Sequence, residues 1–194
     1  MVRMNFSPRS PHLAYTHFLW KALIAPGDIA IDATCGNGHD ALFLAKLPLK
    51  KLYAIDLQEI AIENTRCSLE RHLSPEEKAK VDINQMSHEN LDHLLLEGQV
   101  KLIVYNLGYL PGSNKKVKTL KESTLISLKK SLLLLAKGGA LSITCYPNHE
   151  EGKEEETAIL EWAKDLPASS WEVRYHRWIN RPPLSPSVLF IAAL

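Results

Sequence analysis

The sequence predicts an α/β fold in which helices cover both faces of a mostly parallel sheet of seven strands. Strand-like and helix-like segments alternate along the 194 residues. A glycine-rich turn lies between the first strand and the helix after it, and polar residues follow four of the strands. Because no repeat or linker interrupts this order, we expect a single domain over residues 1–194 that starts with an N-terminal helix.

Each expected strand is a short run of mainly apolar residues. The strands span residues 29–33, 51–56, 81–85, 101–106, 140–146, 171–178 and 187–193. Apolar residues at helical spacing predict helices over 12–25, 40–47, 58–72, 89–97, 119–136 and 152–165. The connection between the last two strands is too short for a crossover helix, so these strands should form an antiparallel pair at the edge of the sheet.

Composition limits the class of protein. The net charge is +1 and the hydrophobic fraction is 45%, values that are ordinary for a globular domain. No apolar run approaches the ~20 residues of a membrane span, and the N-terminus lacks the apolar core of a secretion signal, so we expect a cytoplasmic protein with no membrane contact. The three cysteines, Cys35, Cys67 and Cys145, are far apart in the chain, and neither a disulfide nor a metal site is expected.

The turn over residues 32–40 predicts a binding site for a nucleotide-like cofactor. Gly36 and Gly38 allow the backbone to approach a ligand closely, and the helix that follows offers unpaired N–H groups. A dinucleotide fingerprint would need a third glycine, and two carboxylates beside the turn would repel a pyrophosphate. They suit an amine and sugar hydroxyls, as in S-adenosylmethionine. From this turn the expected cofactor contacts are Asp32, Thr34, Gly36, Asn37, Gly38 and Asp40.

Further candidates follow the second and third strands. Asp56 ends the second strand 20 residues after Gly36, where its carboxylate can accept hydrogen bonds from both ribose hydroxyls. Ser87 and His88 follow the third strand. His88 is open to three interpretations: lining an adenine pocket, lying in solvent beside a helix capped by Ser87, or accepting a proton from a substrate.

The fourth strand ends in Asn106, and the loop after it contains Tyr109. Methyl transfer from a sulfonium is an in-line displacement that needs a lone pair held about 3 Å from the methyl carbon. Asn106 can accept a hydrogen bond from an amine of the substrate, which would aim the lone pair of the amine nitrogen at the methyl group. Tyr109 can stack on a planar base. These two residues are the expected catalytic pair. The alternative is a polar strand end followed by a structural proline turn.

Two basic groups are candidates for phosphate contact. The first is a lysine run between Asn114 and Lys130, and the second is a basic and aromatic group between Arg174 and Arg181. Either group suits a nucleic-acid phosphate, and either is also typical of a solvated surface. His12 and His17, on the opening helix, could cover the active site or lie on a surface helix.

Segments spread over nearly the whole chain together resemble one family. They are residues 32–40, 56–58 with 61–65, 87–90, 106–112 and 146–153. The family is the bacterial YtqB-like group of class I methyltransferases, long described as rRNA methylases. This resemblance implies a Rossmann-like sheet of seven strands, S-adenosylmethionine as cofactor, and cofactor contacts from Asn37, Asp56, Gln58, Ser87 and His88.

The resemblance also implies a substrate. Members of this family are understood to methylate the aminomethyl nitrogen of 5-aminomethyl-2-thiouridine at the wobble position of tRNA, so we expect the anticodon region of tRNA as partner. Alternatives are an rRNA or a small amine as substrate, a nicotinamide-dependent oxidoreductase, or an RNA-binding module on a degenerate fold. A homodimer is also considered, because the apolar residues 190–194 would suit a contact.

Overall fold

The structure is a computed structural model that describes residues 10–94, 96–108 and 121–194. Within them a seven-stranded sheet has the order β3-β2-β1-β4-β5-β7-β6. Strands β1 to β5 are parallel, and β7 runs antiparallel to β5 and β6, which confirms the predicted antiparallel pair. The strands are β1 (Ile29–Asp32), β2 (Lys51–Asp56), β3 (Val81–Gln85), β4 (Val100–Leu107), β5 (Leu135–Cys145), β6 (Trp171–His176) and β7 (Ser187–Ala193).

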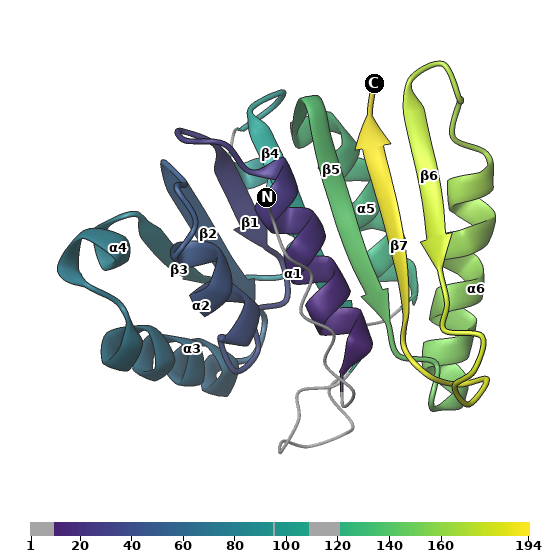
Figure 1. Cartoon of the computed structure of the whole chain (residues 1–194), viewed down its shortest axis with the longest axis horizontal. Helices are drawn as coiled ribbons and strands as arrows, with labels where there is room; N and C mark the ends of the chain where they lie inside the picture. Colours follow the sequence, from purple (N-terminus) through teal and green to yellow (C-terminus); the bar gives the residue numbers. More distant parts are fainter. Residues whose placement is uncertain (1–9, 95, 109–120) are drawn as a thin grey trace.

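Helices cover both faces of the sheet, as predicted (Figure 1). One face carries α1 (Pro11–Leu23), α2 (His39–Ala45) and α3 (Glu59–His72), with the short α4 (Pro75–Ala79) after α3. The other carries α5 (Lys121–Leu134), α6 (Glu150–Lys164) and the 3-10 helix η1 (His88–Leu94). Two apolar clusters, one on each face, form the core. No helix in the described part of the chain is long and apolar enough to cross a membrane.

Helix α1 packs through residues four apart in sequence. His12, Thr16 and Trp20 are buried, and this spacing places them on one side of the helix. Trp20 is 1% exposed and joins the apolar cluster that includes Ala30 and Val104. Helix α1 contacts β4, β5 and β7, so the opening helix lies across the middle of the sheet.

A buried hydroxyl network joins the opposite face of the sheet to its helices. Tyr105 on β4 is fully buried, and its Oη lies 2.6 Å from Ser127 Oγ and 2.7 Å from Ser131 Oγ, one turn apart on α5. Ser127 Oγ also donates to the carbonyl of His88 at 2.8 Å. Burial raises the pKa of Tyr105 to about 12, so its hydroxyl keeps its proton. This network fixes α5 against β4 and η1.

Most predicted boundaries differ from the structure by one or two residues, and three differences are larger. The segment predicted as a helix over 89–97 is the 3-10 helix η1, with Asn90 outside helical geometry (φ −103°, ψ 23°). Helix α4 was not predicted, although Ser74 and Glu77 form a capping box at its start. Strand β5 begins at Leu135 rather than at 140, because the chain continues through Gly138 at φ +67°.

Tyr105→Phe should lower the free energy of unfolding by about 1–3 kcal/mol, because it removes the shared partner of two buried serine hydroxyls. Urea denaturation would measure the change. Tyr53→Phe, at a partly buried tyrosine on β2, is the matched control and should change stability by less than about 0.5 kcal/mol. Equal losses in the two variants would contradict a special contribution from the Tyr105 network.

Candidate active site

The glycine turn after β1 is pressed against α3. Gly36 and Gly38 have φ values of +52° and +76°, a region that favours glycine. A Cβ atom at Gly38 would lie 2.9 Å from Thr65 Cα. Thr65 Oγ1 also donates to the carbonyl of Gly36 at 3.1 Å. Both positions therefore favour glycine because of their backbone conformation. At Gly38 the contact with Thr65 also leaves no room for a side chain.

Asp56 closes the turn from the neighbouring strand. Its Oδ2 accepts from the backbone N–H of Gly36 at 3.0 Å, and its Oδ1 accepts from the N–H of Gln58 at 2.9 Å. Its carbonyl accepts from the N–H of Met86 at 3.0 Å, which joins the ends of β2 and β3. Burial raises the pKa of the Asp56 carboxyl, and the backbone hydrogen bonds oppose that shift. Asp56 is thus a half-buried carboxylate in a fixed orientation, with lone pairs left for a ligand.

Two other predicted residues hold the turn to its neighbours. Asn37 Oδ1 accepts from Asn64 Nδ2 on α3 at 2.9 Å. Thr34 Oγ1 accepts from the backbone N–H of Asn106 at 2.7 Å, which fastens the ends of β1 and β4 together. The ends of β1 and β4 are therefore adjacent in the structure.

Asp40 bridges α1 and β4 from its position on α2. Its Oδ1 accepts from His17 Nε2 and its Oδ2 accepts from Asn106 Nδ2, both at 2.7 Å. The ring of His17 stacks on Phe43 at 3.9 Å between centroids. Because the amide nitrogen of Asn106 donates to Asp40, the Oδ1 atom of Asn106 is left to accept a hydrogen bond from a substrate.

Asp32 lies beneath the turn rather than at its surface. The residue is fully buried, and its Oδ1 accepts from the N–H of Thr34 at 3.3 Å. Burial raises its pKa well above the usual range, and the nearby carboxyl of Asp40 raises it further. We predicted Asp32 and Asp40 as direct cofactor contacts. The structure encloses Asp32 beneath the turn, which gives it a supporting position. Asp40 is bonded to His17 and Asn106, and its direct contact with the cofactor stays a prediction.

His88 is packed and uncharged at neutral pH. Ser87 Oγ accepts from the N–H of Glu89 at 3.3 Å, which is the predicted cap. His88 is only partly exposed, and its ring lies edge-on to Tyr105 at 6.0 Å between centroids. Burial lowers its pKa, and the charge of Glu89 only partly opposes this.

Tyr146 belongs to this region, although the sequence analysis gave it no role of its own. Tyr146 follows β5, and its Oη lies 3.4 Å from Nε2 of the buried His12 on α1. Burial lowers the pKa of His12, while burial and the nearby Asp40 carboxyl raise that of Tyr146. A Cβ atom at Gly108 would lie 3.8 Å from Tyr146 Cβ, so Tyr146 borders the start of the loop after β4. Its position directly after a strand, like that of Asn106, is the signal that could have identified it.

Several predicted features fall elsewhere. Tyr109 and most of the lysine run, including Lys115 and Lys116, lie outside the described residues. Within that run Lys130 is described, and its Nζ contacts Asp92 Oδ1 at 2.8 Å. The apolar C-terminal residues belong to β7 inside the sheet. Among the described residues no group of three or more His, Cys, Asp or Glu side chains could hold a metal ion.

Comparisons with known proteins agree with this geometry. The family model described as Putative rRNA methylase matches residues 52–192. The tRNA (mnm(5)s(2)U34)-methyltransferase, chloroplastic, of Arabidopsis thaliana is 36% identical over 183 residues, which are 90% of this chain and 66% of that protein. The chain thus spans just under two thirds of that relative's length.

Two solved structures align with this chain over the full length of both chains. A putative rRNA methylase of Clostridium thermocellum has a TM-score of 0.87 at 29% identity. A putative methyltransferase of Streptococcus mutans, SMU.1697c in complex with SAH, has a TM-score of 0.84 at 31% identity. These similarities confirm the predicted class I methyltransferase fold.

Gly38→Ala should lower the free energy of unfolding by more than the ~1–2 kcal/mol of the left-handed backbone alone, because its new Cβ would meet the Thr65 backbone. Gly98→Ala is the matched control, since Gly98 has φ +65° but a Cβ atom there would meet nothing within 4 Å. Urea denaturation of both variants would separate strain from contact. Equal losses would contradict the close approach of the turn to α3.

Proposed function

This chain belongs to the family described as Putative rRNA methylase, and we propose that it transfers a methyl group to the aminomethyl nitrogen of 5-aminomethyl-2-thiouridine at the wobble position of tRNA. The methyl donor is S-adenosylmethionine, whose product SAH is bound by the Streptococcus mutans protein of the same fold. The observation that carries the proposal is Asn106, whose amide is oriented by Asp40 beside the cofactor turn.

The residues around the turn fit this cofactor. Asp56 presents a carboxylate of fixed orientation that can accept from both ribose hydroxyls. Beside it Leu57 and Ile60 are 62% and 48% exposed, an apolar surface suited to the adenine ring. The backbone around Gly36 and Gly38 would lie against the amino-acid part of the cofactor. Asn37, Gln58, Ser87 and His88 complete the proposed contacts.

The reaction forms a nitrogen–carbon bond as the carbon–sulfur bond of the sulfonium breaks. The protein has to aim the lone pair of the amine, and Asn106 Oδ1 would do so by accepting one amine N–H. Tyr109, proposed to stack on the base, lies outside the described residues. A primary amine is mostly protonated in water at neutral pH, so the site must also favour its neutral form.

The proposed substrate can be tested with tRNA from a strain that lacks this gene. The purified chain with S-adenosylmethionine should convert its 5-aminomethyl-2-thiouridine to the methylated nucleoside, as measured by nucleoside mass spectrometry. Absence of methyl transfer to the wobble base would reject this substrate. Methyl transfer to rRNA or to a small amine would support the alternatives, and binding of NAD without binding of SAH would indicate an oxidoreductase.

In the same assay Asn106→Ala should lower kcat by about 10²–10³-fold, the usual cost of removing one oriented transition-state hydrogen bond. Asp40→Ala should also lower kcat, because it frees the Asn106 amide to rotate. Calorimetry should show nearly unchanged SAH affinity in Asn106→Ala. A wild-type kcat in this variant would remove Asn106 from the proposed chemistry.

Affinity for SAH should fall in acid, beginning at a higher pH than the ordinary aspartate pKa of about 3.9, because burial raises the pKa of Asp56. Only the ionised carboxylate of Asp56 can accept hydrogen bonds from both ribose hydroxyls. SAH binding is therefore present above the raised pKa of Asp56 and is lost as pH falls through that pKa. Calorimetric titration over a pH series would measure this. Asp56→Asn should bind weakly with a flatter profile, and a flat wild-type profile would contradict the assignment.

A further inference from the structure

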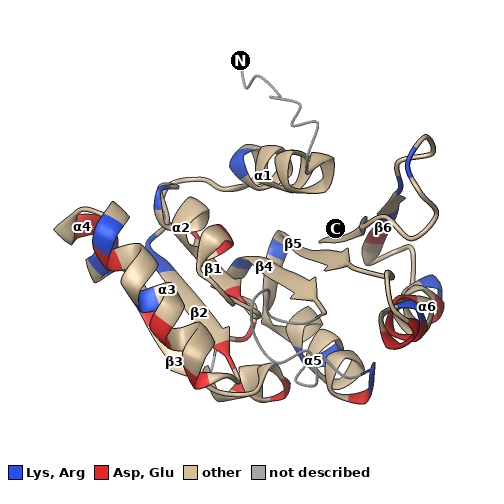
Figure 2. Ribbon diagram, turned by 90° about the horizontal axis from the view of Figure 1, so that it is seen from below, with Lys and Arg blue, Asp and Glu red and all other residues tan. Residues whose placement is uncertain are grey.

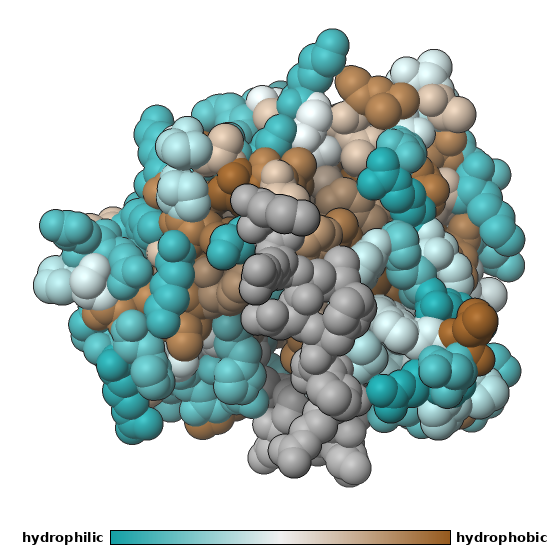
Figure 3. Space-filling view, viewed as in Figure 1, coloured by the Kyte–Doolittle hydropathy of each residue, from teal (hydrophilic) through white to brown (hydrophobic). Residues whose placement is uncertain are grey.

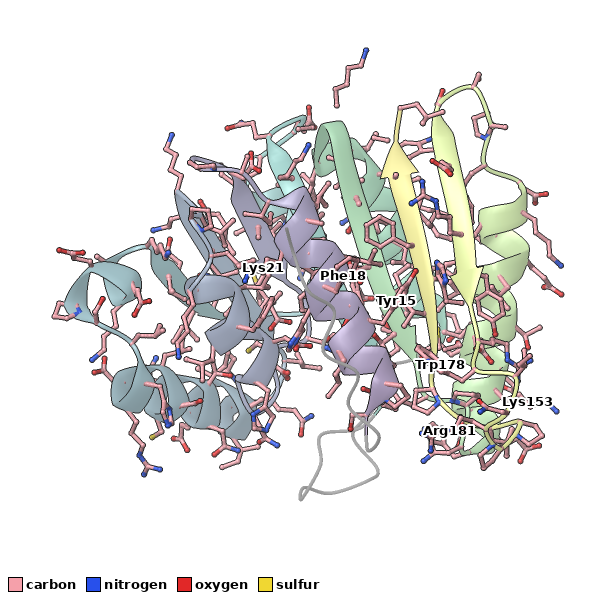
Figure 4. All side chains as sticks on the ribbon, in the orientation of Figure 1. Tyr15, Phe18, Lys21, Lys153, Trp178 and Arg181 are labelled. Carbon is pink, nitrogen blue, oxygen red and sulfur yellow. The ribbon has the colours of Figure 1, made fainter. Side chains whose placement is uncertain are left out.

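A surface of aromatic and basic side chains runs from α1 to the segment after β6. Its members, here called the aromatic–basic surface, are Tyr15, Phe18 and Lys21 on α1, Trp178 and Arg181 after β6, and Lys153 on α6 (Figure 4). Lys21, Lys153 and Arg181 are exposed, and the three aromatic residues are half-buried. Figure 3 shows the same face, with apolar and hydrophilic side chains interspersed.

Ring contacts hold the aromatic part of this surface in place. The ring of Trp178 lies edge-on to His12 at 6.4 Å and to Tyr15 at 6.2 Å between centroids. Tyr15 Oη lies 2.8 Å from Nε2 of His176 at the end of β6. These contacts join α1 to the segment after β6, although the two lie near opposite ends of the sequence. The rings of Tyr15 and Trp178 are therefore held in place before any partner binds.

The charge of this surface suits a polyanion. Helix α1 contains no acidic residue. After β6, the exposed Arg177 and Arg181 flank Ile179, whose side chain is fully exposed. Acidic side chains instead gather on α6, which borders the surface on one side (Figure 2). A negatively charged chain would thus cross α1 and the segment after β6, not run along α6.

The surface is continuous with the candidate active site through α1. His17 bonds to Asp40, which in turn orients Asn106. On the same helix His12 contacts both Tyr146 and Trp178. The outer side of α1 is therefore linked to Asn106 through His17 on α1 and Asp40 on α2.

We propose that the aromatic–basic surface binds the single-stranded loop of an RNA substrate. Its unstacked bases would pack on Phe18, Tyr15 and Trp178, and its phosphates would contact Lys21 and Arg181. Aromatic rings interspersed with cations are the usual platform for single-stranded RNA, since stacking accepts any base and the cations follow the backbone. This inference rests on the proposed function for its claim that the substrate is RNA.

The lysine run of the sequence is a competing location. Its described lysines, Lys121, Lys129 and Lys130, lie on α5, on the opposite face of the sheet. Lys130 is engaged with Asp92. If RNA were bound mainly by the α5 lysines, it would contact the face of the sheet opposite α1. Substitutions on α1 would then leave the affinity for RNA unchanged.

Binding of a labelled anticodon stem-loop RNA, measured by fluorescence anisotropy over a salt series, tests the proposal. Lys21→Glu with Arg181→Glu should weaken binding about 10-fold or more and make its salt slope shallower by about one to two units. Phe18→Ala with Trp178→Phe should weaken binding several-fold with little change in slope. Arg71→Glu with Lys137→Glu is the control, because it changes net charge equally at exposed residues outside this surface.

All variants are first checked for unchanged SAH affinity by calorimetry, which shows that the fold and cofactor site are intact. If a variant has an altered SAH affinity, the single variant Phe18→Ala, on the outer side of α1, is used in its place. Wild-type RNA affinity in the charge-reversal variant, or an equal loss in the control, would overturn the proposed surface. Absence of wobble methylation by a wild-type chain that still binds RNA through this surface would reject only the proposed substrate.

Discussion

The carboxylate of Asp40 holds together the three elements that meet at the candidate active site. A buried charge is stable only when its oxygens are hydrogen-bonded, and Asp40 achieves this through His17 on α1 and Asn106 on β4. Removal of either partner leaves part of the charge uncompensated, so the docking of α1 and the orientation of Asn106 depend on each other. The same contact therefore joins packing to the proposed chemistry.

Helix α1 makes this coupling possible because its successive residues face different neighbours. His12, Thr16 and Trp20 fix it to the sheet. His17 reaches α2 on one flank, and Tyr15 reaches the segment after β6 on the other. The outer side is left for residues such as Phe18 and Lys21. The packing of α1 and the orientation of Asn106 are thus linked through His17 and Asp40.

The parts of this architecture that depend on local sequence were predictable. The apolar strands, the glycine turn and Asp56 each carry a signal within a few residues, and the sheet order brings them to one edge. The Asp40 to Asn106 contact joins residues 66 apart, and the His12 to Tyr146 contact joins residues 134 apart. Such contacts follow from packing and leave no periodic pattern. The burial of Asp32 could not be predicted for the same reason. In the sequence, an aspartate at a strand end that faces a ligand is indistinguishable from one that faces the core.

These contacts also change the physical reason for excluding a dinucleotide. Repulsion of a pyrophosphate by Asp32 and Asp40 requires both carboxylates to face the ligand, whereas one is enclosed and the other is satisfied by protein donors. The proposed preference for S-adenosylmethionine therefore does not depend on this repulsion. Gly38 is packed on Thr65, and Thr34 is bonded to the backbone of Asn106, so the turn cannot open without disturbing β4. The turn is thus held on both sides, between Asp56, the proposed ribose contact, and Asn106, the proposed substrate contact.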